Sequence, residues 1–292
     1  MKHTKKALFF RLLWYIIMIL VSLVFCFPVL YLIFTGFKTP QETVAFPPTL
    51  IPKKWTLSAY EEGLSSGIFS KYLLNSIFVS GMVVIGTVSS AALVGFGFAR
   101  LRSRMKNFLF MLVLATMMIP SSVTLIPVYS IYSKIGWIDT YLPLIVPAFT
   151  GGGAFSIFLI KQFFEAIPNE LVESSKIDGA GWFTIFWKMF LPNSKPVLLV
   201  VIIFAFVNSW NDFFAPLIFL INPEKFTVAI GLNTFRNSYG AAMDIAPLMA
   251  MATLSVLPIL LLFVFALVLL LMLLHLLGFY LLLLDMLLYC LN

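Results

Sequence analysis

Four residues near the end of an apolar stretch carry groups that suit solute binding: Asn208, Trp210, Asn211 and Asp212. Amide and carboxylate groups bind hydroxyls, and an indole ring stacks on the face of a sugar ring. Polar side chains are costly within membrane-spanning segments and often functional. They also hydrogen-bond neighbouring helices. A solute pathway and helix packing both remain open for these four residues.

The sequence offers no other recognisable chemistry. It has no G-x-x-x-x-G-K-[ST] loop for nucleotide phosphates. Cys26 and Cys290 form no C-x-x-C pair, and His3 and His275 are far apart, so neither a disulfide framework nor a metal site is expected. We find no catalytic triad or pair of acids. The chain is therefore not expected to be an enzyme or to bind a cofactor or metal itself.

The composition places these residues in a membrane protein. Hydrophobic residues make up 61% of the chain and charged residues 11%, with a mean hydropathy of +1.04. Soluble domains carry roughly 25% charged residues. The net charge of +7 comes mainly from residues at the ends of apolar segments, which favours a role in membrane topology over nucleic-acid binding.

Six apolar stretches are long enough to span a bilayer, since a spanning helix needs about 20 such residues. We therefore predict an all-α, polytopic membrane protein with six transmembrane helices. The first stretch is too long for the core of a signal peptide and is expected to be retained. The predicted spans are residues 12–34, 73–99, 107–130, 141–162, 196–221 and 245–274.

The distribution of basic residues orients these spans. With a cytoplasmic N-terminus, residues 1–11, 100–106 and 163–195 lie inside and carry twelve Lys or Arg, counting Lys161 at the edge, against seven outside. Positive charge favours the cytoplasmic side. The expected location is the cell (cytoplasmic) membrane, with residues 163–195 facing the cytoplasm.

The segment 163–195 contains a predicted helix–turn–helix. Asn169 is expected to cap a helix over about 170–178, which Asp178 and Gly179 end, because glycine accepts left-handed geometry. A second helix is expected over 182–190, ended by Leu191-Pro192. Charges lie on one side and aromatic residues on the other. By itself this pattern fits either an interfacial amphipathic hairpin or a docking element for a cytoplasmic partner.

The spacing in this segment resembles the cytoplasmic loop of ABC importer permeases, E-A-A, three residues, Gly, nine residues, then I-x-L-P. Here the E-A-A position is Glu173-Ser174-Ser175, the glycine is Gly179, and Met189 to Pro192 stand for I-x-L-P. Both alanines are serine, and the isoleucine is methionine. Asp178-Gly179-Ala180, SWNDFFAPL and MMIPSSVTLIPVY are similar to the carbohydrate-uptake, maltose-transporter-like branch. The resemblance covers about residues 10–270.

This resemblance implies the type I ABC importer permease fold and a division of labour. The short helix would be a coupling helix that docks on a cytoplasmic ATPase, which holds ATP and Mg. The implied partners are a second homologous permease, two copies of the ATPase, and an extracellular or lipid-anchored solute-binding protein that delivers a sugar or oligosaccharide. The residues carried over to the coupling loop are Glu173, Ser174, Ser175, Asp178, Gly179, Ala180, Leu191 and Pro192.

The chain thus divides into a cytoplasmic N-terminus at 1–11, a permease domain at 12–275 that includes the loop 163–195, and a tail at 276–292. The tail departs from the family, which usually turns polar here. Residues 276–291 contain nine leucines in sixteen positions. An added interfacial or partial membrane segment is one interpretation, and an irregularity in the recorded sequence is another.

Two other functions fit a membrane protein of this kind. One is a secondary transporter driven by an ion gradient, although the spans lack buried acids arranged as a relay. The other is a membrane scaffold that uses the helix–turn–helix to recruit a soluble partner. Stimulation of a partner ATPase by a loaded binding protein would separate these from the importer.

Overall fold

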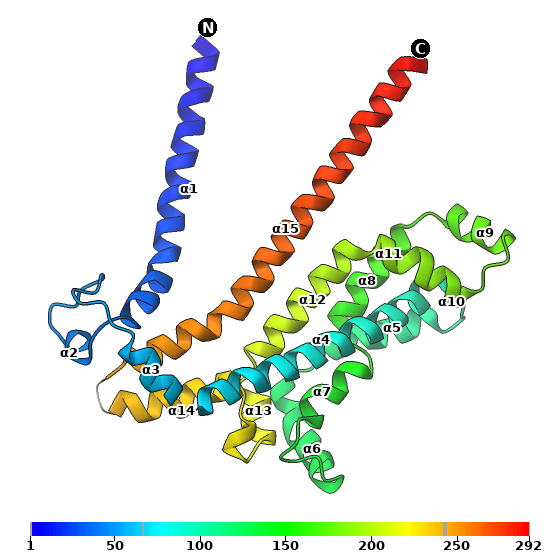
Figure 1. Ribbon diagram of the computed structural model, residues 1–292. Helices are drawn as coiled ribbons and strands as arrows, with labels where there is room; N and C mark the ends of the chain where they lie inside the picture. Colours follow the sequence, from blue (N-terminus) through cyan, green and yellow to red (C-terminus); the bar gives the residue numbers. More distant parts are fainter. Residues whose placement is uncertain (1, 66, 242–243, 292) are drawn as a thin grey trace. The chain divides into compact units, whose positions relative to one another are not determined.

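The computed structural model describes residues 2–65, 67–241 and 244–291, and the regular elements of this part are all helical. Figure 1 shows their course. The elements are α1 (Lys2–Thr35), α2 (Pro40–Thr43), α3 (Ser58–Ser65), α4 (Ile68–Arg100), α5 (Lys106–Ala115), η1 (Thr116–Met118), α6 (Ser121–Lys134), α7 (Leu142–Phe149), α8 (Ala154–Ala166), α9 (Asn169–Ile177), α10 (Trp182–Ile185), η2 (Phe186–Phe190), α11 (Leu191–Asn193), α12 (Lys195–Trp210), α13 (Phe214–Phe219), η3 (Pro223–Lys225), α14 (Val228–Ala241) and α15 (Ala246–Leu291).

Among the described residues, four helices are long and apolar enough to cross a membrane: Phe10–Thr35, Ile68–Arg100, Leu142–Ala166 and Ala246–Leu269. Two bent helix pairs raise the number to six if each pair is one span. They are Lys106–Met118 with Val123–Lys134, and Trp182–Asn193 with Lys195–Trp210. The expected count of six agrees with this upper number.

The end of the predicted span 196–221 differs from the expectation. Helix α12 ends at Trp210, and a separate short helix, α13, follows. Pro216 has no N–H to give to the carbonyl of Asp212, so one hydrogen bond of a continuous helix is missing at this point. The carboxylate of Asp212 instead accepts a hydrogen bond from the Ala215 N–H at 3.2 Å.

The chain forms two compact units. One contains the residues up to Ser70 together with Gly231–Leu257, and the other contains Lys71–Ile230 with the chain from Pro258 onward. In the first unit, Phe37 packs against Tyr60 and Trp55, with ring centroids 5.0 and 5.6 Å apart. Lys38 is buried there, donates to the carbonyl of Thr49 and lies 5.1 Å from the Tyr31 ring centroid. The segment after α1 is therefore a packed cap rather than an open loop.

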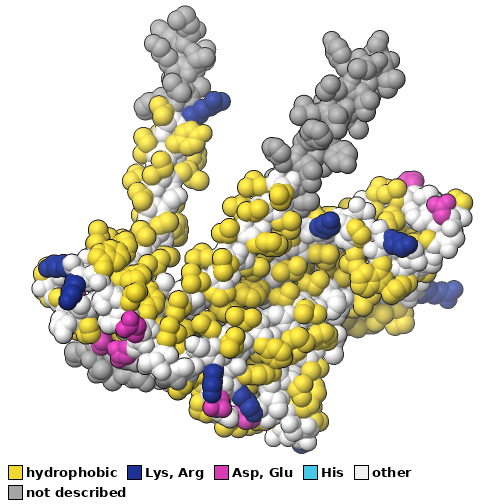
Figure 2. All heavy atoms as spheres, in the orientation of Figure 1, with side chains coloured by type: hydrophobic (Ala, Val, Ile, Leu, Met, Phe, Trp, Pro, Cys, Tyr) yellow, Lys and Arg dark blue, Asp and Glu magenta, His cyan; other side chains and the backbone are white. Residues whose placement is uncertain are grey.

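Helix α1 exposes apolar side chains along the part whose side chains are described, including Trp14, Phe25 and Phe27. Figure 2 shows this hydrophobic surface. In water such a surface would cost free energy, at roughly 25 cal/mol per Å² of apolar area. The exposure fits a helix whose surroundings are lipid.

The second unit is built around α4, α8 and α12, with α5 beside α8 (Figure 1). Helices α4 and α8 approach closely at Gly95, where an added Cβ would lie only 2.9 Å from the side chain of Ile160. The predicted span 141–162 is one membrane-crossing segment broken at Thr150–Gly153, between α7 and α8. Gly152 and Gly153 adopt left-handed φ of +64° and +79° at this break.

Helix α15 continues to Leu291, so the backbone of residues 276–291 is helical. The side chains of this tail, and Asn292, lie outside the described part. The membrane or interfacial placement of the tail stays a prediction.

Candidate functional site

The first helix of the loop 163–195 is α9, Asn169–Ile177, with Glu170 in its first turn. Negative charge there suits the helix dipole. The cap differs from the expectation, because Pro168 occupies the N-cap position and Asn169 is the first helical residue. The Oδ1 atom of Asn169 accepts a hydrogen bond from Arg100 instead. This contact across the fold replaces a local cap.

The end of α9 confirms the predicted stop. Asp178 is the C-cap, and Gly179 follows with φ of +82°. The N–H of Gly179 donates to the Lys176 carbonyl at 3.0 Å, and that of Ala180 donates to the Ser175 carbonyl at 2.9 Å. These two bonds are the Schellman pattern, in which a left-handed residue lets the chain turn back over the helix end.

The return limb is less regular than predicted. A single helix was expected over 182–190, but the structure has a short α-helix, then a π-helix at Phe186–Phe190, then α11. Phe186 and Phe190 are both buried, at 4% and 0% exposure. Leu191-Pro192 does not end the helical path, because Pro192 lies in the first turn of α11, where its missing N–H removes no helical bond.

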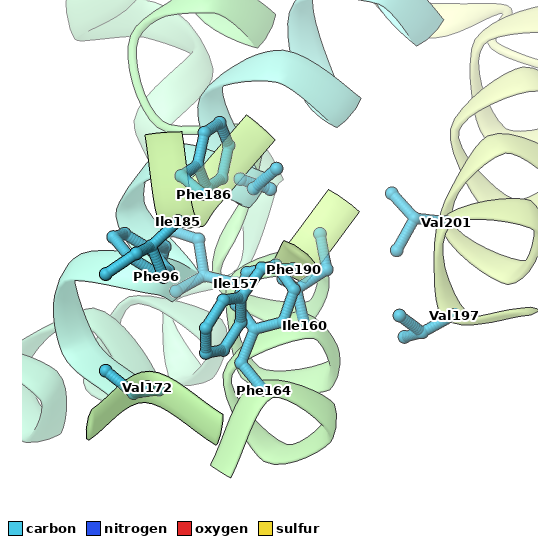
Figure 3. Close-up of a cluster of buried hydrophobic side chains, with 12 residues drawn as sticks. Phe96, Ile157, Ile160, Phe164, Val172, Ile185, Phe186, Phe190, Val197 and Val201 are labelled. Atoms are coloured by element: carbon cyan, nitrogen blue, oxygen red, sulfur yellow. The ribbon is translucent and has the colours of Figure 1, made fainter. Parts of the chain in front are cut away.

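An aromatic and aliphatic core lies under this loop (Figure 3). Phe96, on α4, lies 5.0 Å from Phe190, 5.2 Å from Phe186 and 6.2 Å from Phe164, measured between ring centroids. Val172 brings the underside of α9 into the same cluster. Aromatic pairs of this kind contribute about 0.5–1.5 kcal/mol beyond their buried area. The loop is therefore packed firmly against α4 and α8.

Arg100 adds polar contacts to this packing. Its guanidinium donates to the carbonyls of Phe164, at 2.5 Å, and Ile167, and to Asn169 Oδ1. It also lies 5.0 Å from the Phe190 ring centroid. The sequence assigned Arg100 only a topological role. Its position four residues from Phe96 on the same helix is the one local hint that it faces this core.

The outer side of α9 is free of these contacts. Ile177 is 87% exposed, and Glu173 and Ser174 are also exposed. Acidic side chains lie over α9 in Figure 2. Ser175 is half-buried, with its hydroxyl on the Leu171 carbonyl at 2.8 Å. The helix thus has an anchored underside and an open outer face.

The remaining residues of the motif lie around the turn and the return limb. Asp178 and Gly179 are exposed at the turn, and Ala180 is half-buried and packs against the core. Leu191 is half-buried, and Pro192 is exposed. The structure thus brings all eight expected loop residues into one helical hairpin.

A separate cavity of about 580 Å³ opens within the second unit, among α4, η1, α7, α8, α12 and α13. Asn208 and Ser209 line it from the end of α12, and Asp212 lines it from just beyond that end. Trp210 and Asn211 are not among its lining residues. Trp210 is 3% exposed and stacks on Phe206 at 5.3 Å, and Asn211 donates to the Val207 carbonyl. The four residues singled out in the sequence therefore divide between the cavity and its supporting helix.

Sequence reasoning missed four polar residues in the cavity wall: Thr87, Thr116, Ser156 and Ser209. Serine and threonine within helices commonly bond their own backbone, so their types alone do not mark a site. The Ser80 hydroxyl lies 3.2 Å from the Ser209 hydroxyl and ties α4 to α12 beside the cavity. No group of three or more metal-ligating side chains comes together in the described residues.

This architecture defines a class, namely a polytopic all-α membrane protein with an anchored helical hairpin whose short first helix has an exposed outer face. A solved structure shares the fold. The crystal structure of a bacterial ABC transporter involved in the import of the acidic polysaccharide alginate aligns with a TM-score of 0.77 at 20% identity, over 87% of this chain and 94% of that one.

The family model described as "Binding-protein-dependent transport system inner membrane component" matches residues 91–281, and the chain belongs to this family. It is 35% identical to the ABC transporter permease protein ORF2 of Caldicellulosiruptor sp. (strain Rt8B.4), over 90% of this chain and 93% of the relative. It is 32% identical to the arabinooligosaccharides transport system permease protein AraQ of Halalkalibacterium halodurans, over 84% and 88%. It is 28% identical to the sn-glycerol-3-phosphate transport system permease protein UgpE of Brucella abortus (strain 2308), over 87% and 92%.

Membership confirms the main expectations. The chain is a membrane permease subunit of an ABC importer, not an enzyme, and its fold is the all-α ABC importer permease fold. Such a subunit works with an ATPase and a binding protein.

Proposed function

We propose that this chain moves a sugar or oligosaccharide inward across the cell membrane, after an extracellular or lipid-anchored solute-binding protein delivers it. The similarity to a permease of arabinooligosaccharide transport supports a carbohydrate substrate. The hydroxyl, amide and carboxylate groups of the cavity suit a polyhydroxylated solute. Asn208 and Asp212 contact the solute, while Trp210 and Asn211 hold the end of α12 in place.

The assembly we propose contains this chain, a second homologous permease and two copies of a cytoplasmic ATPase that holds ATP and Mg. The N-terminus and the loop 163–195 face the cytoplasm, which agrees with the excess of basic residues on that side.

The observation that carries this proposal is the two-sided character of α9. Its underside is fixed through Val172 to the aromatic core around Phe96 and Phe190, while Glu173 and Ile177 point outward. A helix held this way moves with α4 and α8 as one body. Closure of the ATPase pair would therefore pull directly on two membrane-crossing helices, which is the mechanical requirement for switching access to the cavity.

The first test is to purify the chain from its native membrane in mild detergent and identify what co-purifies. We expect a second six-span permease and a nucleotide-binding ATPase in a ratio of roughly 1:1:2, as in an assembly with one pair of permeases. Reconstituted in liposomes with its binding protein, the complex should transport labelled arabinotriose only when ATP is present on the side of the membrane where the ATPase subunits lie.

Uptake that survives ATP depletion and collapses with an ion gradient would contradict the proposal and favour a secondary transporter. Recovery of the chain with a soluble partner that has no ATPase activity would favour a membrane scaffold.

A further inference from the structure

The described lining of the cavity carries negative but no positive charge. Its wall is formed by apolar side chains, by hydroxyl and amide groups, and by one ionisable residue, Asp212. The described lining residues include no Lys, Arg or His. A lone carboxylate repels an anion that enters the same space, and the low dielectric of the surrounding protein strengthens that repulsion.

Three basic residues elsewhere in the second unit have partners away from the cavity. Lys225 pairs with Asp139 at 2.8 Å, and Lys161 pairs with Glu165 at 2.7 Å. Arg100 is held by the coupling loop. These side chains are therefore committed to other partners and do not supply the bidentate or charge-assisted hydrogen bonds by which proteins bind phosphate and carboxylate.

The rest of the wall suits a neutral polyol. Hydroxyl and amide groups at Thr87, Ser156 and Asn208 donate and accept hydrogen bonds without net charge. Phe155 and Phe204, with ring centroids 5.3 Å apart, offer an apolar surface for the C–H faces of a sugar ring. A volume of about 580 Å³ falls within the range of sites that hold small organic ligands, roughly 300–1,000 Å³.

We infer that the cavity accepts neutral polyhydroxylated solutes and excludes anionic ones, such as sugar phosphates and uronates, because Asp212 is the only charged residue in the described part of its lining. This inference rests on the proposed function for its role in transport. It separates this chain from the sn-glycerol-3-phosphate permease UgpE and from the importer of the acidic polysaccharide alginate.

The charge selectivity is testable without knowing the substrate. A single thiol is introduced by Ala154→Cys, on the cavity wall, in a chain where Cys26 and Cys290 are alanine. The assembled transporter in lipid nanodiscs is then treated with methanethiosulfonate reagents of similar size that carry a trimethylammonium or a sulfonate group. Each rate is divided by the rate of the same reagent with 2-mercaptoethanol.

We expect the cationic reagent to react roughly tenfold faster than the anionic one after this correction, which corresponds to about 1.4 kcal/mol. Adding Asp212→Asn should bring the two corrected rates close together. Equal corrected rates with Asp212 present, faster reaction of the anionic reagent, or no reaction of either reagent would overturn the inference.

Transport supplies a separate readout. In the reconstituted complex, arabinotriose uptake is measured beside the ratio of the corrected cationic rate to the corrected anionic rate. No uptake together with the expected tenfold ratio would refute the proposed function while supporting the selectivity of the cavity. Normal uptake together with equal corrected rates of the two reagents would refute the selectivity alone.

Discussion

The guanidinium of Arg100 lies 5.0 Å from the centre of the Phe190 ring. Arg100 ends the helix α4, whereas Phe190 belongs to the return limb of the coupling loop. The same guanidinium donates to Phe164, Ile167 and Asn169 on the outgoing limb. One side chain therefore joins both limbs of the loop to a membrane-crossing helix.

We expect Arg100→Gln to loosen the coupling loop. The neutral amide cannot reach all three acceptors, and hydrogen bonds from charged donors are each worth roughly 1.5–3 kcal/mol. Solute moved per ATP hydrolysed should fall in proteoliposomes, and the melting temperature of the complex should fall as well. Arg100→Lys should give an intermediate result, because an ammonium lacks the planar fork of the guanidinium.

The matched control is Arg102→Gln, which removes an exposed basic residue of the same segment. It should resemble the unmodified protein. Arg100 has no special role in coupling if the two glutamine variants transport equally well per ATP.

A second prediction concerns the turn after α9. Gly179 has φ of +82°, whereas Gly181 has an ordinary φ of −73°, and a Cβ on either would meet no atom within 4 Å. Gly179→Asp should strain the turn by about 1–2 kcal/mol, since left-handed geometry disfavours side chains. We expect normal insertion into the membrane but weakened ATPase binding and low uptake.

Gly181→Asp is the control, because it adds the same charge two residues away without backbone strain. Aspartate is a favourable residue at a helix N-cap, the position that Gly181 holds for α10. Co-purification of the ATPase with each variant provides the measurement. Normal ATPase binding and uptake by Gly179→Asp would show that the turn geometry is not needed for coupling.

A third prediction concerns the break between α7 and α8. A Cβ on Gly152 would lie 2.6 Å from the carbonyl oxygen of Thr87, a backbone atom of α4 that cannot move aside easily. Gly153 has a similar left-handed φ but open space around its Cβ position. Thermal unfolding in detergent should show a small loss for Gly153→Ala, about 1–2 kcal/mol, and a larger loss for Gly152→Ala.

Comparing these two alanine variants tests the steric contact, because both residues have a positive φ but only Gly152 lies against α4. Similar melting temperatures for the two variants would mean that α4 can move away from the residue at position 152 without loss of stability.

A fourth prediction follows from Asp139. Backbone N–H donation from Asn222, the hydrogen bond from Lys225 and N–H donation from Ile221 hold the pKa of this carboxyl at about 2, against 3.8 for the free side chain. The unfolded chain therefore binds a proton at a higher pH than the folded protein. The stability from Asp139 is complete above about pH 5 and is lost as the pH falls from about 5 to 2.

We expect this stability to be roughly 1 kcal/mol, below the full linkage value, because solvent screens a partly exposed pair. The side chains of Lys225 and Asp139 are 37% and 30% exposed. The measurement is the difference in unfolding free energy between the unmodified protein and Asp139→Asn, from pH 7 to 3. The difference should shrink as the solution becomes acidic, and a constant difference would contradict the shifted pKa.

The sequence predicted some local features of the loop 163–195 correctly. The stop at Asp178 and Gly179 depends on residues that are adjacent in the chain, so their types were sufficient to place it. The cap at Asn169 and the regular helix at 182–190 were wrong for a shared reason. In both places contacts from α4, through Arg100 and Phe96, override the local preference.

The cavity was only partly accessible to sequence reasoning. Asn208 and Asp212 stood out because amides and carboxylates are rare in apolar spans. Thr87 and Ser156 did not, because small hydroxyl residues are common in membrane helices and satisfy themselves on their own backbone. Whether such a residue lines a cavity depends on which helix faces it.

By itself, the sequence determined that the chain is an all-α membrane protein, where its long apolar stretches lie apart from the end of 196–221, and where the motif of the loop 163–195 falls. These properties follow from composition and from spacing within a few residues. Only the tertiary structure decided that Arg100 contacts both limbs of the loop and that Gly152 lies against Thr87. It also decided that Asp212 is the one charged residue among the described residues that line the cavity. Each of these depends on helices distant in sequence, whose approach is set by packing of the whole unit rather than by local preference.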